Sequence, residues 1–170
     1  ALDRNPELRF ILVGQEAAIR SGLAAFPALA AASEIHDAAE VISGADRPAL
    51  AIRRAKTSSM GQMIDLVKQG RADAGVSGGN TGALMAMSNL SLRTMKGIGR
   101  PALAALLPTL GENDIVMLDL GANAECDERN LVEFAVMGAA YARTVLGTEM
   151  PRVALLNIGT FFVYWKDKVA

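Results

Sequence analysis

Cysteine is nearly absent from this sequence, and so is any excess of charge of one sign. Cys126 is the single cysteine among 170 residues, so no internal disulfide can form. Seventeen basic residues stand against eighteen acidic ones, which leaves no global field to draw the chain onto nucleic acid or an anionic membrane. Because no charged and then apolar leader precedes the first strand-like run, we expect a cytoplasmic protein.

Long hydrophobic runs and several catalytic motifs are also missing. Charged residues or glycines interrupt every apolar stretch before it reaches the roughly 18 residues that span a bilayer. The sequence holds no Gly-x-Ser-x-Gly elbow, no paired-cysteine zinc pattern and no His-Glu-x-x-His helix. Cys126 and His36 formally allow a nucleophilic dyad, but nothing brings the two together, and such lone residues are more often structural.

The residues that are present suffice for a globular core, since 51% are hydrophobic and 21% charged. Short apolar runs bounded by glycine, proline or charge predict strands buried on both faces. These runs are Phe10–Val13, Ala72–Val76, Ala102–Leu107, Ile115–Leu118 and Val153–Leu156. Segments with helical spacing alternate with them, around 19–26, 60–67 and 131–145. The alternation predicts an α/β fold with a mostly parallel sheet.

Two segments differ from this pattern. Ala83–Leu92 is apolar almost all round, which predicts a helix buried under another layer or in a dimer contact. Residues 160–170 carry half of all the aromatic side chains and form an atypical tail behind a single domain at 1–159.

The strongest local signal is a glycine-rich loop between a predicted strand and a predicted helix. It reads Ser77-Gly78-Gly79-Asn80-Thr81-Gly82. Glycines let the backbone approach a ligand, and the free N–H groups and dipole of a helix start favour an anion. The spacing matches neither the P-loop nor the dinucleotide motif, so a bare phosphate or phosphate ester fits better. The alternative is a tight turn in which Asn80 or Thr81 caps the helix.

Two further segments could carry chemistry. Asp119, Glu125 and Asp127 follow the run Ile115–Leu118, at the strand end where α/β sheets bind ligands. They could position a substrate or bind Mg²⁺, although their spacing is no recognised metal signature; ordinary turn chemistry explains them too. Upstream, the cations Arg53, Arg54 and Lys56 precede Ser58 and Ser59. They suit phosphate binding, or a solvated basic turn followed by a serine cap.

Taken together, these segments resemble the bacterial phosphate acyltransferase family (PlsX). The matching segments are Ile11–Gly14, His36–Ile42, Pro48–Arg54, Lys56–Met60, Gly70–Ala74, Ser77–Leu84, Arg100–Ala104, Leu118–Cys126, Phe134–Gly138, Tyr141–Arg143 and Leu156–Gly159. Their order and density make chance similarity improbable. The family's opening Asp-Ala-Met-Gly-Gly-Asp strand is absent, and the sequence departs from the family after Gly159, so we expect a partial chain and an incomplete fold.

The resemblance implies transfer of a fatty acyl group from acyl carrier protein to inorganic phosphate, without a metal or organic cofactor. It also implies a three-layer fold like those of isocitrate and isopropylmalate dehydrogenases and phosphotransacetylases, homodimers, and peripheral association with the inner membrane. Alternatives are a phosphotransacetylase-like enzyme that uses acyl-coenzyme A, and a non-catalytic fragment that binds an anion.

That chemistry suggests roles for the candidate residues. Phosphate must be held against a thioester carbonyl, and the developing oxyanion must be stabilised. We expect the loop from Ser77 to Gly82 to orient phosphate and Arg53, Arg54 or Lys56 to balance its charge. Asn123 or Asn157 would donate to the oxyanion.

Overall fold

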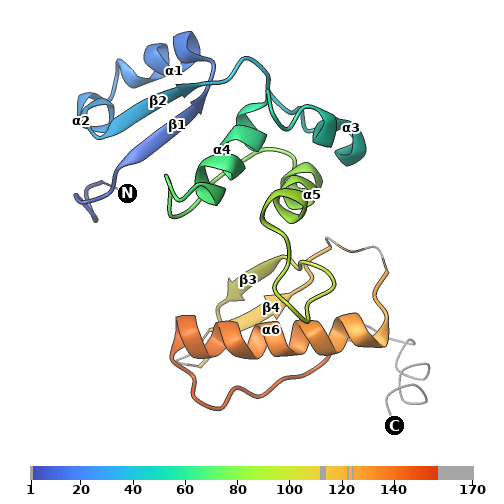
Figure 1. The fold of residues 1–170 in the computed structure, drawn as a ribbon. Coiled ribbons are helices and arrows are strands. Elements are labelled where there is room, and N and C mark those ends of the chain that lie inside the picture. The colour runs from blue at the N-terminus through green and yellow to red at the C-terminus, as the bar shows by residue number, and fades with distance from the viewer. Residues whose placement is uncertain (1, 112–113, 122, 124, 157–170) are drawn as a thin grey trace. The chain divides into compact units, whose positions relative to one another are not determined.

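The structure is a computed structural model that describes residues 2–111, 114–121, 123 and 125–156. The chain divides into two compact units, Ala1–Arg93 and Thr94–Ala170, and each is described by itself. The elements run along the chain as shown in Figure 1: β1 (Phe10–Gly14), α1 (Glu16–Leu23), α2 (Pro27–Ala31), β2 (Ser33–Asp37), α3 (Pro48–Arg53), α4 (Ser59–Lys68), α5 (Thr81–Leu92), β3 (Ala104–Leu107), β4 (Ile115–Leu118) and α6 (Glu128–Leu146).

The first unit starts with a parallel pair of strands. Phe10 of β1 lies opposite Ser33 of β2, and the register continues to Gly14 opposite Asp37. The end of β2 also supports the next helix, because the Glu16 N–H at the start of α1 donates to Asp37 Oδ1 at 2.9 Å. This bond satisfies one of the N–H groups that a helix start leaves without an intrahelical partner.

The rest of the first unit is a small helical core. Buried apolar side chains from α3, α4, α5 and the loop before α3 pack together there: Ile42, Ala51, Met60, Ile64, Ala83 and Met87. Gly61 in α4 allows the closest approach, since a Cβ built on it would lie 1.8 Å from the backbone oxygen of Ala55. No side chain fits there, so α4 packs directly on the preceding turn.

The second unit combines an antiparallel hairpin with one long helix. Ala104 of β3 lies opposite Leu118 of β4, and a Cβ on Gly138 of α6 would lie 3.0 Å from the Leu118 side chain. Asp127 opens α6 with a reciprocal capping box to Asn130, which satisfies the first free N–H groups of the helix.

Most of the predicted elements are confirmed, including the strands at 10–13 and 115–118 and the helices around 60–67 and 131–145. The mostly parallel sheet is wrong for the described residues, because one strand pair is parallel and the other antiparallel. The predicted strands Ala72–Val76 and Val153–Leu156 are also wrong, since neither segment is in a strand. Val76 is 92% exposed and Leu156 is 78% exposed. Each apolar run therefore keeps a large apolar side chain in contact with solvent.

The all-apolar helix α5 is covered on one side only. Ala83 and Met87 are buried, whereas Leu90 is 60% exposed and Leu92 47%. Burial under another layer of this chain is therefore confirmed for one side of α5 only, and the alternative of a dimer contact stays a prediction. Among the described residues, no helix has the length and apolar character to cross a bilayer. The predicted tail at 160–170 lies outside the described residues.

Candidate functional site

The glycine-rich loop leads directly into α5, as the sequence predicts. Asn80 is the N-cap, and its Oδ1 accepts a hydrogen bond from the Ala83 N–H at 2.9 Å. Ser77 Oγ accepts from the Gly79 N–H at 3.2 Å. Within the described part of the chain, the N–H groups of Thr81 and Gly82 have no acceptor. These two donors stand at the positive end of the helix dipole, where an anion is favoured.

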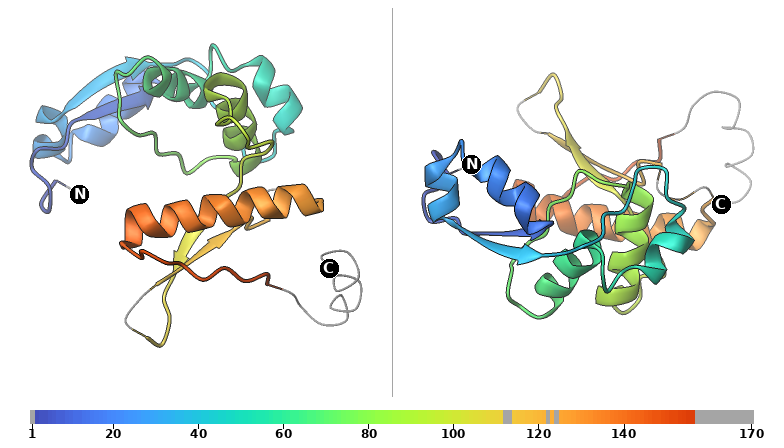
Figure 2. Two further views of the ribbon diagram at one scale, coloured as in Figure 1. Left: turned by 60° about the horizontal axis from the view of Figure 1, so that its bottom comes forward. Right: turned by 90° about the horizontal axis from the view of Figure 1, so that it is seen from above.

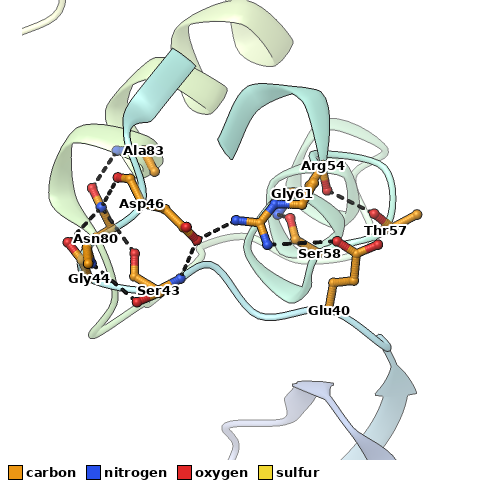
Figure 3. Close-up of polar contacts among 11 residues, drawn as sticks. Glu40, Ser43, Gly44, Asp46, Arg54, Thr57, Ser58, Gly61, Asn80 and Ala83 are labelled. Atoms are coloured by element: carbon orange, nitrogen blue, oxygen red, sulfur yellow. Dashed lines mark hydrogen bonds and ion pairs between the residues drawn. The ribbon is translucent and has the colours of Figure 1, made fainter. Parts of the chain in front are cut away.

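The amide nitrogen of Asn80 has different partners from its oxygen. Nδ2 donates to the backbone oxygens of Asp46 at 2.8 Å, Gly44 at 3.1 Å and Ser43 at 3.2 Å (Figure 3). Because an amide carries only two N–H hydrogens, these contacts use its donor capacity completely. Asn80 therefore links the 43–46 loop to the start of α5 through hydrogen bonds. Direct contact between Asn80 and phosphate stays a prediction.

An ion-pair network supports the same loop from the other side. Asp46 accepts from the Ser43 N–H at 2.8 Å and pairs with Arg54, which lies 4.0 Å from Glu40 (Figure 3). The hydrogen bond from Ser43 and the pairing with Arg54 lower the pKa of Asp46 below its ordinary value. Arg54 is thus engaged within the protein rather than free for a ligand.

The other two cations of this segment are exposed, whereas the two serines make hydrogen bonds within the fold. Arg53 and Lys56 are exposed and form no ion pair among the described residues. Ser58 is fully buried and caps α4, with its Oγ accepting from the Gly61 N–H at 3.3 Å. The Ser59 N–H donates to a backbone oxygen of the segment that follows β2, at 2.9 Å. The alternative of a serine cap is thus confirmed for Ser58. Arg53 and Lys56 are exposed to solvent, and phosphate binding by them stays a prediction.

The glycines of the loop differ in what surrounds them. A Cβ on Gly79 would lie 3.1 Å from the Met60 side chain, and one on Gly82 would lie 3.1 Å from Pro48. Gly78 has no atom within 4 Å of that position. A side chain at Gly79 or Gly82 would therefore require these neighbours to shift by a few tenths of an ångström, whereas one at Gly78 would meet open space.

The second candidate segment is a tightly bonded turn after β4. Asp119 has a backbone φ of 60°, in the left-handed region that residues other than glycine rarely adopt. Its N–H donates to Leu103 O at 2.8 Å. Asp119 Oδ1 accepts from the Asn123 side chain at 2.8 Å, and its Oδ2 accepts from the Cys126 thiol at 3.2 Å. The Asn123 amide also donates to Pro101 O at 3.2 Å. Both Asn123 and Asp119 are thus held by the turn itself.

Electrostatics argue against Cys126 as a nucleophile. Burial and the hydrogen bond to the Asp119 carboxylate raise the pKa of the thiol to about 11, and the thiolate is the reactive form. Asp127 serves as the cap of α6. The described residues contain no group of three or more histidine, cysteine or acidic side chains that could hold a metal ion.

Glu133 is a buried carboxylate that the sequence reasoning missed. It accepts from the Gly99 N–H at 2.6 Å and from Arg129 at 2.8 Å, and these two bonds lower its pKa. A carboxylate between Val132 and Phe134 in an otherwise apolar stretch was the available signal. Asn157 lies outside the described residues.

The fold and the site define an α/β protein with a glycine-rich loop opening a capped helix. A family model described as fatty acid synthesis protein matches residues 1–163. The chain belongs to this family.

Relatives from three bacteria share the name phosphate acyltransferase. The protein of Erythrobacter litoralis (strain HTCC2594) is 59% identical over 157 residues, which cover 92% of this chain and 44% of that protein. The Rhodospirillum rubrum protein is 51% identical, covering 94% and 46%. The Shewanella halifaxensis protein is 46% identical, covering 99% and 50%. The chain spans half or less of the length of these relatives.

Proposed function

We propose that this chain forms part of an enzyme that transfers a fatty acyl group from acyl carrier protein to inorganic phosphate. A phosphate oxygen attacks the thioester carbonyl carbon, the carbon–sulfur bond breaks, and the carrier leaves as a free thiol with acyl phosphate as the other product. The observation that carries the proposal is the 59% identity to a phosphate acyltransferase over 92% of the chain.

The loop geometry supports a phosphate site at the start of α5. Two backbone N–H groups, at Thr81 and Gly82, lack acceptors among the described residues, and a Cβ built on Gly78 in the same loop would have no atom within 4 Å. Ser77 and the Thr81 hydroxyl would add hydrogen bonds. Asn80 would act as a positioning residue, because its polar atoms already hold the loop.

The remaining groups would complete the reaction in the assembled enzyme. Exposed Arg53 and Lys56 are free to balance phosphate charge, with Arg54, Ser58 and Ser59 shaping the turn that carries them. Asn123 Nδ2 already donates to Asp119 Oδ1 and to Pro101 O, which uses both of its hydrogens. Asn123 would therefore donate to the oxyanion only after giving up one of these bonds, and Asn157 is the other proposed donor. A donor that is held in place stabilises developing charge more than a mobile one does.

The proposal includes the wider properties of such an enzyme. We infer a three-layer fold of the isocitrate and isopropylmalate dehydrogenase or phosphotransacetylase type, with residues 1–159 as part of that domain. The enzyme would act as a homodimer in the cytoplasm, with peripheral contact to the inner membrane. The chain's own α/β elements support the fold type.

A chimera tests the proposal. The 157 matching residues of the Erythrobacter litoralis protein are replaced by those of this chain, and release of carrier thiol from acyl carrier protein is followed with a thiol reagent. We expect release that requires phosphate. A folded chimera that releases no thiol while the unmodified relative does would contradict the proposal. Faster reaction with acyl-coenzyme A than with acyl carrier protein would instead indicate a phosphotransacetylase-like enzyme.

A further inference from the structure

The side chain of Asp46 closes the short turn that Asn80 contacts. The turn spans residues 43–46. The Asp46 N–H donates to Ser43 O at 3.1 Å, and Asp46 Oδ2 accepts from the Ser43 N–H at 2.8 Å. The Ser43 hydroxyl oxygen also accepts from the Ala45 N–H at 3.3 Å. The Asp46 carboxylate therefore helps to fix the backbone conformation of the turn.

The closed turn directs three backbone oxygens at one atom. The oxygens of Ser43, Gly44 and Asp46 lie 3.2, 3.1 and 2.8 Å from Asn80 Nδ2. An amide nitrogen has only two hydrogens to share, so three carbonyls can meet it only when the turn holds them in matching orientations. The turn thus orients the Asn80 side chain, and with it the oxygen that caps the Ala83 N–H in α5.

The other side of the Asp46 carboxylate faces Arg54 (Figure 3). The Arg54 guanidinium also lies 4.0 Å from Glu40, and the Arg54 backbone oxygen accepts from the Ser58 N–H at 2.8 Å. Ser58 is the buried cap of α4. Asp46 is therefore connected through hydrogen bonds and an ion pair to the start of α4 as well as to the start of α5.

A packing contact joins the same turn to the glycine-rich loop. Pro48 opens α3 two residues after Asp46, and a Cβ built on Gly82 would lie 3.1 Å from the Pro48 ring. Both views of Figure 2 show α3 beside α5. A shift of the turn would thus disturb the Asn80 cap and the packing on Gly82, where the N–H groups of Thr81 and Gly82 have no acceptor among the described residues.

We propose that Asp46 is a positioning residue of the phosphate site: its carboxylate holds the 43–46 turn, the turn orients Asn80, and Asn80 keeps the start of α5 in the geometry that binds phosphate. The inference rests on the proposed function and deepens it, because it concerns the same site. Asp46 acts without touching phosphate, since its carboxylate is engaged by Ser43 and Arg54 and would repel an anion.

The chimera described above tests this role through its kinetic constants. Asp46→Ala removes the bond to Ser43 and the ion pair, and we expect the KM for phosphate to rise about tenfold. The kcat and the KM for acyl carrier protein should change by less than about threefold, as for a loss of phosphate binding alone. Glu34→Gln is the matched control, because it breaks the ion pair to Arg71 in the same unit and should leave the KM for phosphate unchanged.

Two kinetic results would overturn the proposal. One is a normal KM for phosphate in a folded Asp46→Ala chimera. The other is an equal change in kcat and in the KM of both substrates, which indicates general loosening of the protein. If Asp46→Ala does not fold, Asp46→Asn decides by the same criteria, because loss of the ion pair alone should raise the KM for phosphate about threefold.

Hydrogen exchange gives a readout that does not depend on activity. In the unmodified chimera, phosphate should slow exchange of the Thr81 and Gly82 amides. Asp46→Ala should weaken this slowing and should accelerate exchange at Ala83 by at least about fivefold, whereas Glu34→Gln should alter neither. Unchanged exchange at Ala83 in Asp46→Ala would contradict the positioning role.

The two readouts separate this proposal from the proposed function. Phosphate protection of Thr81 and Gly82 without thiol release would contradict the acyltransferase function, and exchange would still decide whether that protection depends on Asp46. Thiol release whose KM for phosphate does not depend on Asp46 would contradict the positioning role alone. No phosphate protection in the unmodified chimera would overturn both the site at the start of α5 and the role of Asp46.

Discussion

Replacing Asn80 by alanine should weaken the loop and the start of α5 together. The change removes the cap to the Ala83 N–H, which costs about 1 kcal/mol. It also removes two amide hydrogens shared among three carbonyls, at net contributions of about 0.5 to 1.5 kcal/mol each. The sum is a loss of about 2 to 4 kcal/mol in the free energy of unfolding. Asn80→Ser keeps a capping oxygen without placing a second acceptor against the three carbonyls, and it should recover about 1 kcal/mol of this.

Urea unfolding followed by circular dichroism measures the total, and hydrogen exchange at residues 83–87 assigns it to α5. The local readout is needed because two compact units can unfold separately. Asn89→Ala is the matched control, because Asn89 is exposed on the same helix and forms no side-chain hydrogen bond among the described residues. A change of less than about 0.5 kcal/mol in Asn80→Ala, the range of ordinary surface substitutions, would contradict a stabilising role for the Asn80 side chain.

Three further predictions rest on single contacts. Gly61→Ala places a Cβ 1.8 Å from a backbone oxygen and should prevent α4 from packing, which a loss of helical circular dichroism would show. Gly22→Ala is the control: its Cβ meets nothing within 4 Å, and it should stabilise the chain by roughly 0.5 to 1 kcal/mol. Burial and the Asp119 carboxylate raise the pKa of Cys126 to about 11, so iodoacetamide at pH 8 should label it slowly, and Asp119→Asn should accelerate labelling by about tenfold; equal rates would refute the pairing. Because the pKa of Asp46 is lowered in the folded chain, its stabilising effect is present above the ordinary value of 3.8 and is lost as pH falls through the lowered pKa; Asp46→Asn should flatten that part of the stability profile in acid titration.

Local sequence patterns predicted the cap at the start of α5. Asn80 before an apolar helix is a capping signal that depends on neighbours in sequence, and the structure confirms the cap. The partners of its amide nitrogen lie 34 to 37 residues away. No local pattern encodes such bonds, so the role of Asn80 in holding the 43–46 loop could not be predicted.

The strands, too, were predicted correctly only where their own residues carry the signal. The apolar run at 10–13 predicts β1, whereas β2, with the sequence Ser-Glu-Ile-His-Asp, carries no apolar run and was missed. Ala72–Val76 has the composition of a buried strand but no ladder partner among the described residues. The apolar content of a segment predicts whether it will be buried. Whether it forms a strand also depends on partner strands that lie far away in the sequence.

Phosphate binding at the start of α5 can be tested by measuring the KM for phosphate of the chimera with an altered loop. Thr81→Val removes a hydroxyl while keeping the branched shape, and Gly78→Ala places a methyl group where the structure has open space. If phosphate binds at the start of α5, Thr81→Val should raise the KM for phosphate by about 10- to 100-fold, which corresponds to one charge-assisted hydrogen bond. Gly78→Ala should raise it because its methyl group would take space that phosphate needs, and Gly22→Ala should leave it unchanged. Normal phosphate KM values in folded Thr81→Val and Gly78→Ala chimeras would contradict the site.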